Sequence, residues 1–390
     1  GVEWLYQKTG DSTATLTGYN KYGKKRPTGV VVLPSKIDGY TITEVGGLAF
    51  RENTDITGVI IPDTITSIGE GAFYKCKNLL QVQFPKNLKS IGKRAFNEAG
   101  LVELSFPKSE ISIGYAAFMN NKSLKRVEFK AKTIMDEDIF AACNSLESVV
   151  MDDETTDLSN GMFNYCTSLK SIRLPKKLKT IGNGAFLECN SLTDITIPEG
   201  VNSIGANAFW NCGALRSITI PKNVEEIKSA TFQGCSELAS VNIQGNVTSI
   251  GYNAFMNCES IHNIVLPESV SEIGNRVFWR CESLESIRIP QKVSILKENT
   301  FTGCTSLRTV ELNRGLRTIE QYVFSGCSSL RKVALPEGLT TIEQGAFVNN
   351  SALKYIYLPQ SLGNIGKGAF ASCSNLTDVY YGGSELSWKA

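Results

Sequence analysis

The amino-acid sequence predicts a solenoid, a stack of similar coils that each add a short β-strand to a parallel sheet. Two observations lead to this fold class: a phenylalanine that recurs at a fixed spacing, and an alternation of apolar residues before a proline. Fifteen phenylalanines are separated by twelve intervals of 23 residues and two of 22 residues. They are Phe50, Phe73, Phe96, Phe118, Phe140, Phe163, Phe186, Phe209, Phe232, Phe255, Phe278, Phe301, Phe324, Phe347 and Phe370. Regular self-similarity at this period indicates stacked repeats.

Residues 191–212, SLTDITIPEGVNSIGANAFWNC, show what one copy of the repeat contains. The segment from Leu192 to Ile197 ends in an apolar–polar alternation, which is typical of a short strand. Pro198 follows directly and cannot donate a hydrogen bond, so the strand is expected to end there. Because one copy is too small to bury its own apolar face, neighbouring copies must cover each other. The repeated phenylalanines are therefore expected to form a buried aromatic ladder.

The two ends of the chain depart from the repeat and are expected to cap it. Residues 1–28 read as strand, turn and strand around Lys8–Ser12, which predicts an N-terminal hairpin over the open edge of the first coil. The solenoid is expected over residues 29–381. Residues 382–390 are expected to form a small C-terminal cap.

The composition is that of an ordinary folded protein and excludes several classes. The chain has 390 residues, a formal net charge of +2, 42% hydrophobic residues and 20% charged residues. A dedicated nucleic-acid binder would carry a strong basic excess, which is missing here. No run of 18 or more apolar residues occurs, so no membrane span is expected. The opening GVEWLYQKTG does not read as a secretory signal, although Gly1 could mark a mature or trimmed start.

From about Val30 to Tyr381 the chain resembles the BspA-like leucine-rich repeats of bacterial surface proteins. The resemblance lies in the motif L-x-x-I-x-I-P, which is followed by I-G-x-x-A-F-x-x-C. The resemblance implies a leucine-rich repeat solenoid, a curved right-handed array of about fifteen coils with short parallel strands on one face. It also implies a secreted or cell-surface location and a role in adhesion or host contact. The closing DVYYGGSELSW resembles the family's terminal Y-x-G-x-x-x-x-W element, in which Trp388 is expected to fold back on the last coil.

All eleven cysteines lie three residues after a repeat phenylalanine. The four copies without cysteine carry Asn53, Ala99, Asn121 and Asn350 there, which predicts a small buried slot filled by free thiols. Stacked cysteines have parallel Cβ vectors, which is poor geometry for a disulfide, although disulfides stay a minor alternative. No C-x-x-C pair occurs, so the sequence gives almost no support to a zinc site.

The sequence argues against an enzyme and predicts no cofactor. The chain has one histidine, His262, which is expected on the surface. A catalytic triad that needs a histidine would have to use this residue. The common phosphate-loop motifs are absent. A carbohydrate-active enzyme that uses stray carboxylates is the less favoured alternative.

Two other features have both a functional and a plain interpretation. Acidic residues gather in an irregular zone, at 136–138 and at 152–157. They either bind a hard cation such as calcium or form solvated turns, and solvated turns are the favoured interpretation.

The residue that directly follows the repeat phenylalanine is the second feature. In five successive copies it is Leu187, Trp210, Gln233, Met256 and Trp279. These side chains either form an exposed ridge or pack as an outer wall, and packing is favoured.

The solvent side of the strands is the best candidate for a binding surface, because it is broad, mixed in charge and rich in tyrosine and arginine. The partner-binding candidates are Arg173, Arg216, Arg288, Arg308, Arg331, Lys354, Tyr355, Tyr357 and Tyr380. The chain is therefore expected to be a non-catalytic interaction protein that binds a protein or glycan partner. The alternative is a passive spacer within a larger surface protein. The oligomeric state, the anchoring mode and the identity of the ligand stay open.

Overall fold

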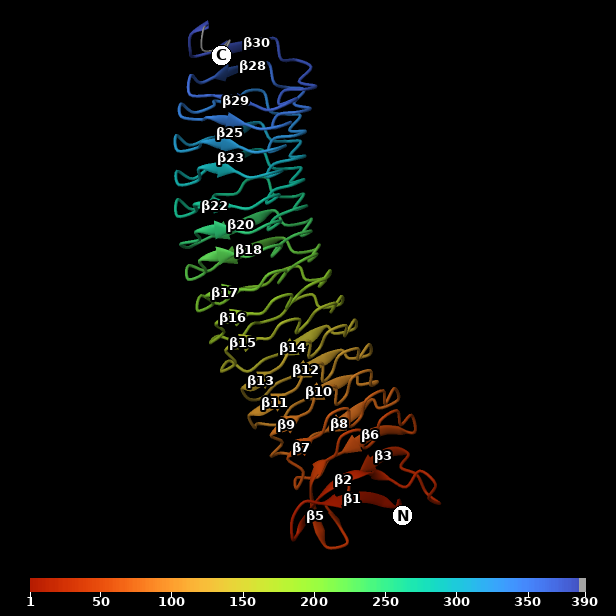
Figure 1. The fold of residues 1–390 in the computed structure, drawn as a ribbon. Coiled ribbons are helices and arrows are strands. Elements are labelled where there is room, and N and C mark those ends of the chain that lie inside the picture. The colour runs from red at the N-terminus through yellow and green to blue at the C-terminus, as the bar shows by residue number, and fades with distance from the viewer. Residues whose placement is uncertain (386–390) are drawn as a thin grey trace. The chain divides into compact units, whose positions relative to one another are not determined.

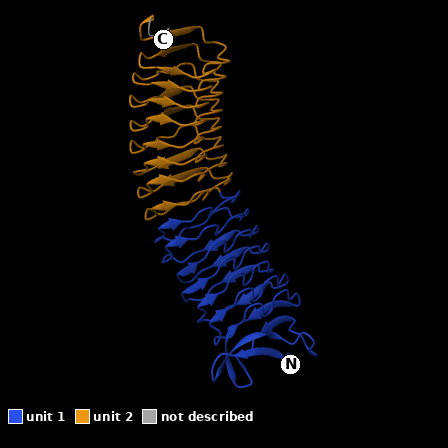
Figure 2. Ribbon diagram, in the orientation of Figure 1, with its two compact units in different colours: residues 1–192 blue, residues 193–390 orange. Residues whose placement is uncertain are grey.

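The computed structural model describes residues 1–385. The chain forms two compact units, residues 1–192 and residues 193–390, and each is described by itself (Figure 2). Within each unit the strands of successive coils run side by side (Figure 1). This confirms the predicted solenoid of coils at a spacing of about 23 residues. Residues 386–390, and with them the predicted position of Trp388, lie outside the described residues.

The segment L-x-x-I-x-I forms the predicted strand in most coils, and we call the ladder of these strands the first-strand face. No strand is present over 192–197, where the sequence predicted one, although Ile195 and Ile197 are buried and Thr196 is exposed as expected. In residues 1–192 it comprises β3 (Gly29–Val32), β6 (Ile56–Ile60), β8 (Gln81–Gln83), β10 (Glu103–Ser105), β12 (Arg126–Glu128) and β14 (Ser148–Val150). In residues 193–385 it comprises β18 (Ser217–Ile220), β20 (Ser240–Ile243), β23 (Ser286–Arg288), β25 (Thr309–Glu311), β28 (Tyr355–Leu358) and β30 (Asp378–Tyr381). The pairs β3-β6-β8, β10-β12-β14, β18-β20, β23-β25 and β28-β30 are all parallel.

Each coil also carries a second short strand, which the sequence analysis did not predict. In residues 1–192 these strands are β5 (Tyr40–Val45), β7 (Ser67–Ile68), β9 (Ser90–Ile91), β11 (Ile111–Ile113), β13 (Thr133–Met135), β15 (Asp157–Leu158) and β16 (Thr180–Ile181). In residues 193–385 they are β17 (Ser203–Ile204), β19 (Glu226–Ile227), β21 (Ser249–Ile250), β22 (Glu272–Ile273), β24 (Ile295–Leu296), β26 (Thr318–Ile319), β27 (Thr341–Ile342) and β29 (Asn364–Ile365). They pair in parallel through the isoleucine of the Ile-Gly motif, as in Ile68↔Ile91.

The glycine of the Ile-Gly motif lets neighbouring coils approach each other closely. A Cβ atom built on Gly92 would lie 2.6 Å from the backbone nitrogen of Glu70 in the preceding coil. The same glycine donates its backbone N–H to the carbonyl oxygen of Ile68 at 2.7 Å. The motif therefore continues the second-strand ladder beyond the strand itself. Glycine suits this close approach, but other coils make the same hydrogen bond with a larger residue, as at Glu320 and Glu343.

The core is an aromatic ladder, as predicted. Ring centroids of successive repeat phenylalanines lie 5.0–6.0 Å apart from Phe50 to Phe186. In residues 193–385 the spacing is 5.2–5.7 Å from Phe209 to Phe370. All but the last of these rings are buried. Stacked rings at this distance add attraction beyond that of their buried area.

The backbone turns sharply on both sides of each repeat phenylalanine. The residues two before and two after it have left-handed backbone angles, for example Asn253 (φ 59°) and Asn257 (φ 58°) around Phe255. Glycine and asparagine tolerate this conformation at little cost. Several coils nevertheless place other residues there, among them Ala142 (φ 58°) and Tyr322 (φ 57°). This turn is the second feature of the repeat that the sequence analysis missed.

The N-terminal hairpin is present and covers the first coil. Strands β1 (Trp4–Lys8) and β2 (Thr13–Tyr19) pair antiparallel, and β2 continues in parallel onto β5. The Trp4 and Tyr19 rings contact the Phe50 ring at 6.2 and 6.0 Å and so end the aromatic ladder. The small strand β4 (Lys36–Ile37) pairs with β5. The hairpin caps the sheet of second strands, β1-β2-β5-β7-β9-β11-β13.

Candidate functional site

The nine residues predicted to bind a partner are all exposed on the first-strand side of the coils. Arg173 belongs to residues 1–192, so its position relative to the others is not described. The other eight belong to residues 193–385. Three of the arginines are already engaged: Arg173 donates to Asp153 at 2.7 Å, Arg216 lies 3.6 Å from Glu237, and Arg288 contacts two carboxylates. Arg308, Arg331 and Lys354 have no ion pair with any described residue.

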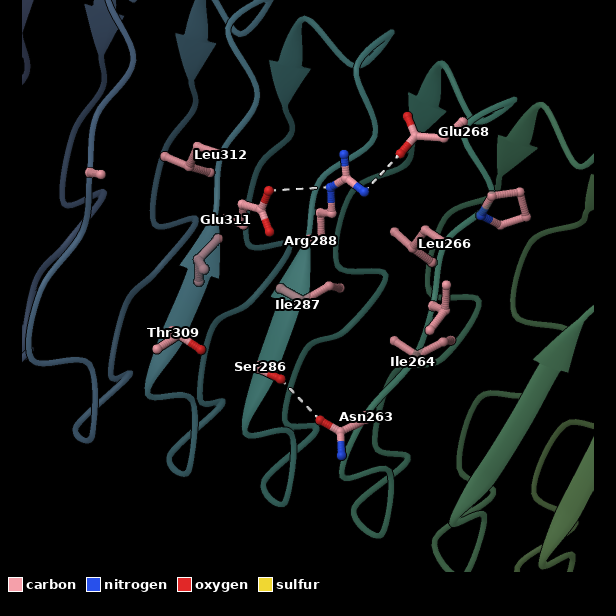
Figure 3. A pocket seen from close by; sticks show the side chains of 14 residues that line it. Asn263, Ile264, Leu266, Glu268, Ser286, Ile287, Arg288, Thr309, Glu311 and Leu312 are labelled. Atoms are coloured by element: carbon pink, nitrogen blue, oxygen red, sulfur yellow. Dashed lines mark hydrogen bonds and ion pairs between the residues drawn. The ribbon is translucent and has the colours of Figure 1, made fainter.

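A groove of about 790 Å³ opens on the first-strand face between residues 263 and 334 (Figure 3). Its lining includes the apolar side chains of Ile264, Leu266 and Ile287, which lie between the polar groups of the rim. Val265, which also lines the groove, is 81% exposed, far more than expected for a valine in a folded protein. The groove therefore combines an apolar lining with an apolar side chain that no part of the described chain covers.

One arginine organises the charge at the rim of the groove. The Arg288 guanidinium lies between two carboxylates, 3.4 Å from Glu268 and 3.3 Å from Glu311 (Figure 3). All three side chains are more than half exposed, so these ion pairs contribute little to stability. Their effect is to hold the guanidinium in one position. On another part of the rim, Ser286 Oγ donates to Asn263 Oδ1 at 3.0 Å.

Three exposed tyrosines continue the face beyond the groove. Ala334, which lines the groove, pairs in parallel register with Tyr357, and Tyr357 pairs with Tyr380. Tyr355 lies two residues earlier on β28, on the same side of the strand. The three rings are between 45% and 55% exposed. The structure thus brings the predicted Arg288, Tyr357 and Tyr380 onto one continuous row of outward positions.

The sequence analysis did not single out Val265, although the pattern contained a signal for it. In the segment HNIVLP, Ile264 and Leu266 take the inward positions, so Val265 must point outward. The equivalent positions of most other coils carry polar or tyrosine side chains, among them Thr219, Asn242 and Arg288. Apolar residues also occupy this position at Val32, Val150 and Ala334, so what distinguishes Val265 is its exposure of 81%, which only the structure gives.

The cysteines are structural and offer no nucleophile. All eleven are free and buried, as predicted. Ten of them donate the thiol to the carbonyl oxygen of the phenylalanine one coil earlier, at 3.0–3.4 Å. Burial raises the pKa of Cys143, Cys235 and Cys304 to about 12. Thiols with so high a pKa stay protonated and unreactive at neutral pH.

Two carboxylates of the acidic zone, Asp153 and Glu154, form ion pairs with basic side chains. Asp153 contacts both Arg173 and Lys176, and Glu154 contacts Lys177 at 2.7 Å. Hydrogen bonds from Arg173 and from the Lys176 backbone lower the pKa of Asp153 to about 2. Within residues 1–385, no group of three or more histidine, cysteine, aspartate or glutamate side chains is placed to hold a metal ion.

The two remaining sequence features have plain structural roles. His262 is exposed, and its Nδ1 lies 2.9 Å from the carbonyl oxygen of Ser260. The side chains of Leu187, Trp210, Gln233, Met256 and Trp279 are half-buried, which agrees with the interpretation that they pack as an outer wall. The Arg276 guanidinium lies over the Trp279 ring at 5.1 Å and covers part of it. No helix within residues 1–385 has the length and apolar character to span a bilayer.

Comparison with known proteins agrees with this geometry. The model of the BspA type leucine-rich repeat region matches residues 43–170, 156–285 and 271–387. A leucine-rich repeat protein from Bacteroides ovatus is 30% identical, with a TM-score of 0.74, and the match covers 97% of this chain and 92% of that one. A leucine-rich cell surface protein from Faecalibacterium prausnitzii is 25% identical, with a TM-score of 0.50, and the match covers 100% and 95%.

No curated protein matches the chain significantly. The family model nevertheless spans most of the sequence, from residue 43 to residue 387, and the Bacteroides ovatus structure is similar over nearly its whole length. The chain belongs to the BspA-type leucine-rich repeat family.

Proposed function

We propose that the chain binds a protein partner through the first-strand face of residues 193–385, outside the bacterial cell, in an adhesive or host-contact role. The observation that carries the proposal is the groove beside Val265, which continues in register into the exposed Tyr357 and Tyr380. An apolar lining, a charged rim and neighbouring tyrosines are the usual composition of a protein interface. The extracellular location rests on the family and on the cell-surface protein of Faecalibacterium prausnitzii.

A polypeptide suits the groove better than a sugar does. Val265 offers an apolar side chain of a partner an exposed apolar contact, whereas Ile264, Leu266 and Ile287 line the groove with only 4–6% of their surface exposed. Arg288 is held between Glu268 and Glu311, so the rim offers both signs of charge to a partner. Such an arrangement fixes the register of a peptide more than it adds affinity.

Catalysis by carboxylates finds little support at this site. Hydrolysis of a glycoside needs one carboxyl group that delivers a proton and a second that acts as base or nucleophile. Glu268 and Glu311, the carboxylates at the groove, both contact the same arginine. This leaves a non-catalytic binding surface as the function that the geometry favours.

The test compares matched variants on the two faces of the same unit. Val265→Asp places a charge in the groove, and Ile295→Asp makes the same change at an exposed isoleucine of β24 on the other strand ladder. Both proteins are screened against arrays of purified extracellular proteins and of glycans. We expect protein ligands whose binding falls about tenfold or more in Val265→Asp and persists in Ile295→Asp.

Three results would contradict the proposal. Binding only to glycans would assign a different ligand class to the chain. An equal loss of binding in both variants would mean that the first-strand face is not the interface. Failure to bind any member of either array would support the passive spacer.

A further inference from the structure

The two strand ladders of residues 1–192 end differently at the N-terminal side. The ladder of second strands is closed by the β1–β2 hairpin. The ladder of first strands ends at β3, which pairs with β6 alone. Among the described residues β3 is therefore an uncovered edge, and such edges are templates for an added strand.

The hydrogen bonds of β3 show which backbone groups are free. Leu33 donates its N–H to the carbonyl oxygen of Ile60 at 3.0 Å, so the groups of residues 31 and 33 face β6. In a parallel ladder the alternate residues face the other way. The N–H and C=O groups of Val30 and Val32 consequently point away from the sheet, without a backbone partner in the described chain.

The side chains at this edge are apolar and uncovered. Val30 is 56% exposed and Val32 is 63% exposed, and β3 has no charged residue or proline to discourage pairing, while its register against β6 shifts between Gly29 and Val30. The edge therefore offers hydrogen bonds together with two exposed apolar side chains, Val30 and Val32, against which an apolar side chain of an added strand packs.

A run of positive charge flanks the edge strand. Lys21, Lys24, Lys25 and Arg26 precede β3, all exposed and without an ion pair to any described residue, and the exposed Lys36 follows it. Two copies of the chain that paired through β3 would set these basic groups against one another in either strand direction. Charge complementarity instead favours an acidic partner.

We propose that β3 is a docking edge for an extended acidic peptide segment of another protein, which adds to the ladder as a further strand. Its backbone pairs with Val30 and Val32, an apolar side chain packs against the exposed side chains of these two valines, and its carboxylates face the run from Lys24 to Arg26. When a peptide adds to the edge of a sheet as a strand, main-chain hydrogen bonds provide the affinity. Contacts of every second side chain provide the specificity. It is independent of the first-strand face of residues 193–385 and adds a second site to the proposed function.

The probes are two short fluorescent peptides in which a stretch of alternating valine and threonine either follows or precedes a run of glutamates. Controls carry lysines in place of the glutamates, or N-methyl groups on alternate amides. We expect binding of at least one acidic peptide at low salt, weakening as salt rises. The lysine and N-methylated controls are expected to bind about tenfold more weakly or less. In the complex, the amides of Val30 and Val32 are expected to gain protection from hydrogen exchange.

Two protein variants test the geometry. Val32→Pro removes an outward N–H without touching the bonds to β6, a change that an edge strand tolerates, and Val32→Thr is its control. The triple variant Lys24→Glu, Lys25→Glu and Arg26→Glu alters only exposed side chains, so it keeps the test valid if Val32→Pro fails to fold. Each is expected to weaken binding about tenfold, with Val32→Thr close to wild type.

The proposal is overturned if neither acidic peptide binds, or if binding survives both changes. It is also overturned by self-association that Val32→Pro abolishes, because the occupant would then be a second copy of the chain. Val265→Asp leaves this site unaltered, so failure here and failure of the proposed function are distinguishable.

Discussion

The Cys235 thiol donates a hydrogen bond to the carbonyl oxygen of Phe209, one coil earlier, at 3.1 Å. The same contact recurs along both units and links each coil to its predecessor through the turn that holds the phenylalanine. The cysteine thus fills a small slot and also satisfies a buried carbonyl. Both roles depend on a protonated thiol, because a thiolate cannot donate a hydrogen bond.

The first prediction concerns alkaline stability. Burial raises the pKa of Cys143 and Cys235 to about 12, whereas an unfolded thiol ionises near pH 9. The folded chain then holds more protons than the unfolded chain between these values. The contribution of these thiols to the free energy of unfolding is therefore constant below pH 9. It falls as the pH rises toward 12, by about 1.4 kcal/mol per pH unit for each buried thiol.

Urea unfolding at successive pH values measures this loss, and Cys143→Ala is expected to reduce the slope by the share of one thiol. A thiol reagent at neutral pH should label native protein slowly and all eleven cysteines after denaturation. A flat stability profile between pH 9 and pH 11, or rapid labelling of the native protein, would contradict the assignment.

The second prediction uses two of the three asparagines that replace cysteine, Asn121 and Asn350. Asn350 Nδ2 donates to the carbonyl oxygens of Phe324 and Phe347, but its Oδ1 is buried without a partner. Asn121 makes the equivalent two bonds, and its Oδ1 also accepts from the Leu101 N–H at 3.3 Å. Asn350→Cys removes an unpaired oxygen, whereas Asn121→Cys leaves a buried N–H without an acceptor.

We therefore expect Asn350→Cys to stay within about 1 kcal/mol of wild type and Asn121→Cys to lose about 1–3 kcal/mol. Chemical denaturation of both variants measures the difference. Equal losses would mean that slot size alone, without hydrogen bonding, determines which residue is accepted.

The sequence was sufficient to predict the parts of the fold that depend on spacing. Residues equivalent to Phe255 and Cys258 recur at a fixed spacing along the chain. Their burial could be predicted because each coil must present the same side chains to its neighbours. The groove could not be predicted in the same way. It depends on the small side chain of Ala334, three coils beyond Leu266, and on the ion pair of Arg288 with Glu268. Neither feature appears as a period in the sequence.

The second strand and the left-handed turns were missed for a different reason. The second strand is only two residues long in most coils, too short for an alternation to be visible. The left-handed positions do carry a signal, because glycine and asparagine recur there, as at Gly184 and Asn207. The signal is diluted by coils that accept Arg94 or Tyr322 at the same place.

The third prediction tests these turns. Ala142 has a φ of 58°, a conformation that costs an alanine about 1–2 kcal/mol and a glycine almost nothing. Glycine also loses more backbone entropy on folding, about 0.5–1 kcal/mol, so Ala142→Gly is expected to stabilise the protein slightly, by up to about 1 kcal/mol. Its neighbour Ala141 is buried and has no such angle, so Ala141→Gly is expected to destabilise it. Thermal unfolding of the pair measures both signs, and destabilisation by Ala142→Gly would refute the account.

The fourth prediction concerns the ion pair of the acidic zone. Arg173 donates to Asp153 at 2.7 Å and, with the Lys176 backbone, lowers the pKa of that carboxyl to about 2. A carboxyl group with a lowered pKa stabilises the fold at pH values above its ordinary pKa of 3.8. This contribution is lost as the pH falls toward 2.

Titration followed by NMR of the Asp153 carboxyl carbon should therefore show a midpoint near 2. Arg173→Gln is expected to move the midpoint upward toward 3.8, and Arg216→Gln, at an arginine paired elsewhere, is expected to leave it unchanged. A midpoint near 3.8 in the wild-type protein would mean that the pair does not persist in solution, and the acidic zone would then again be free to bind a cation.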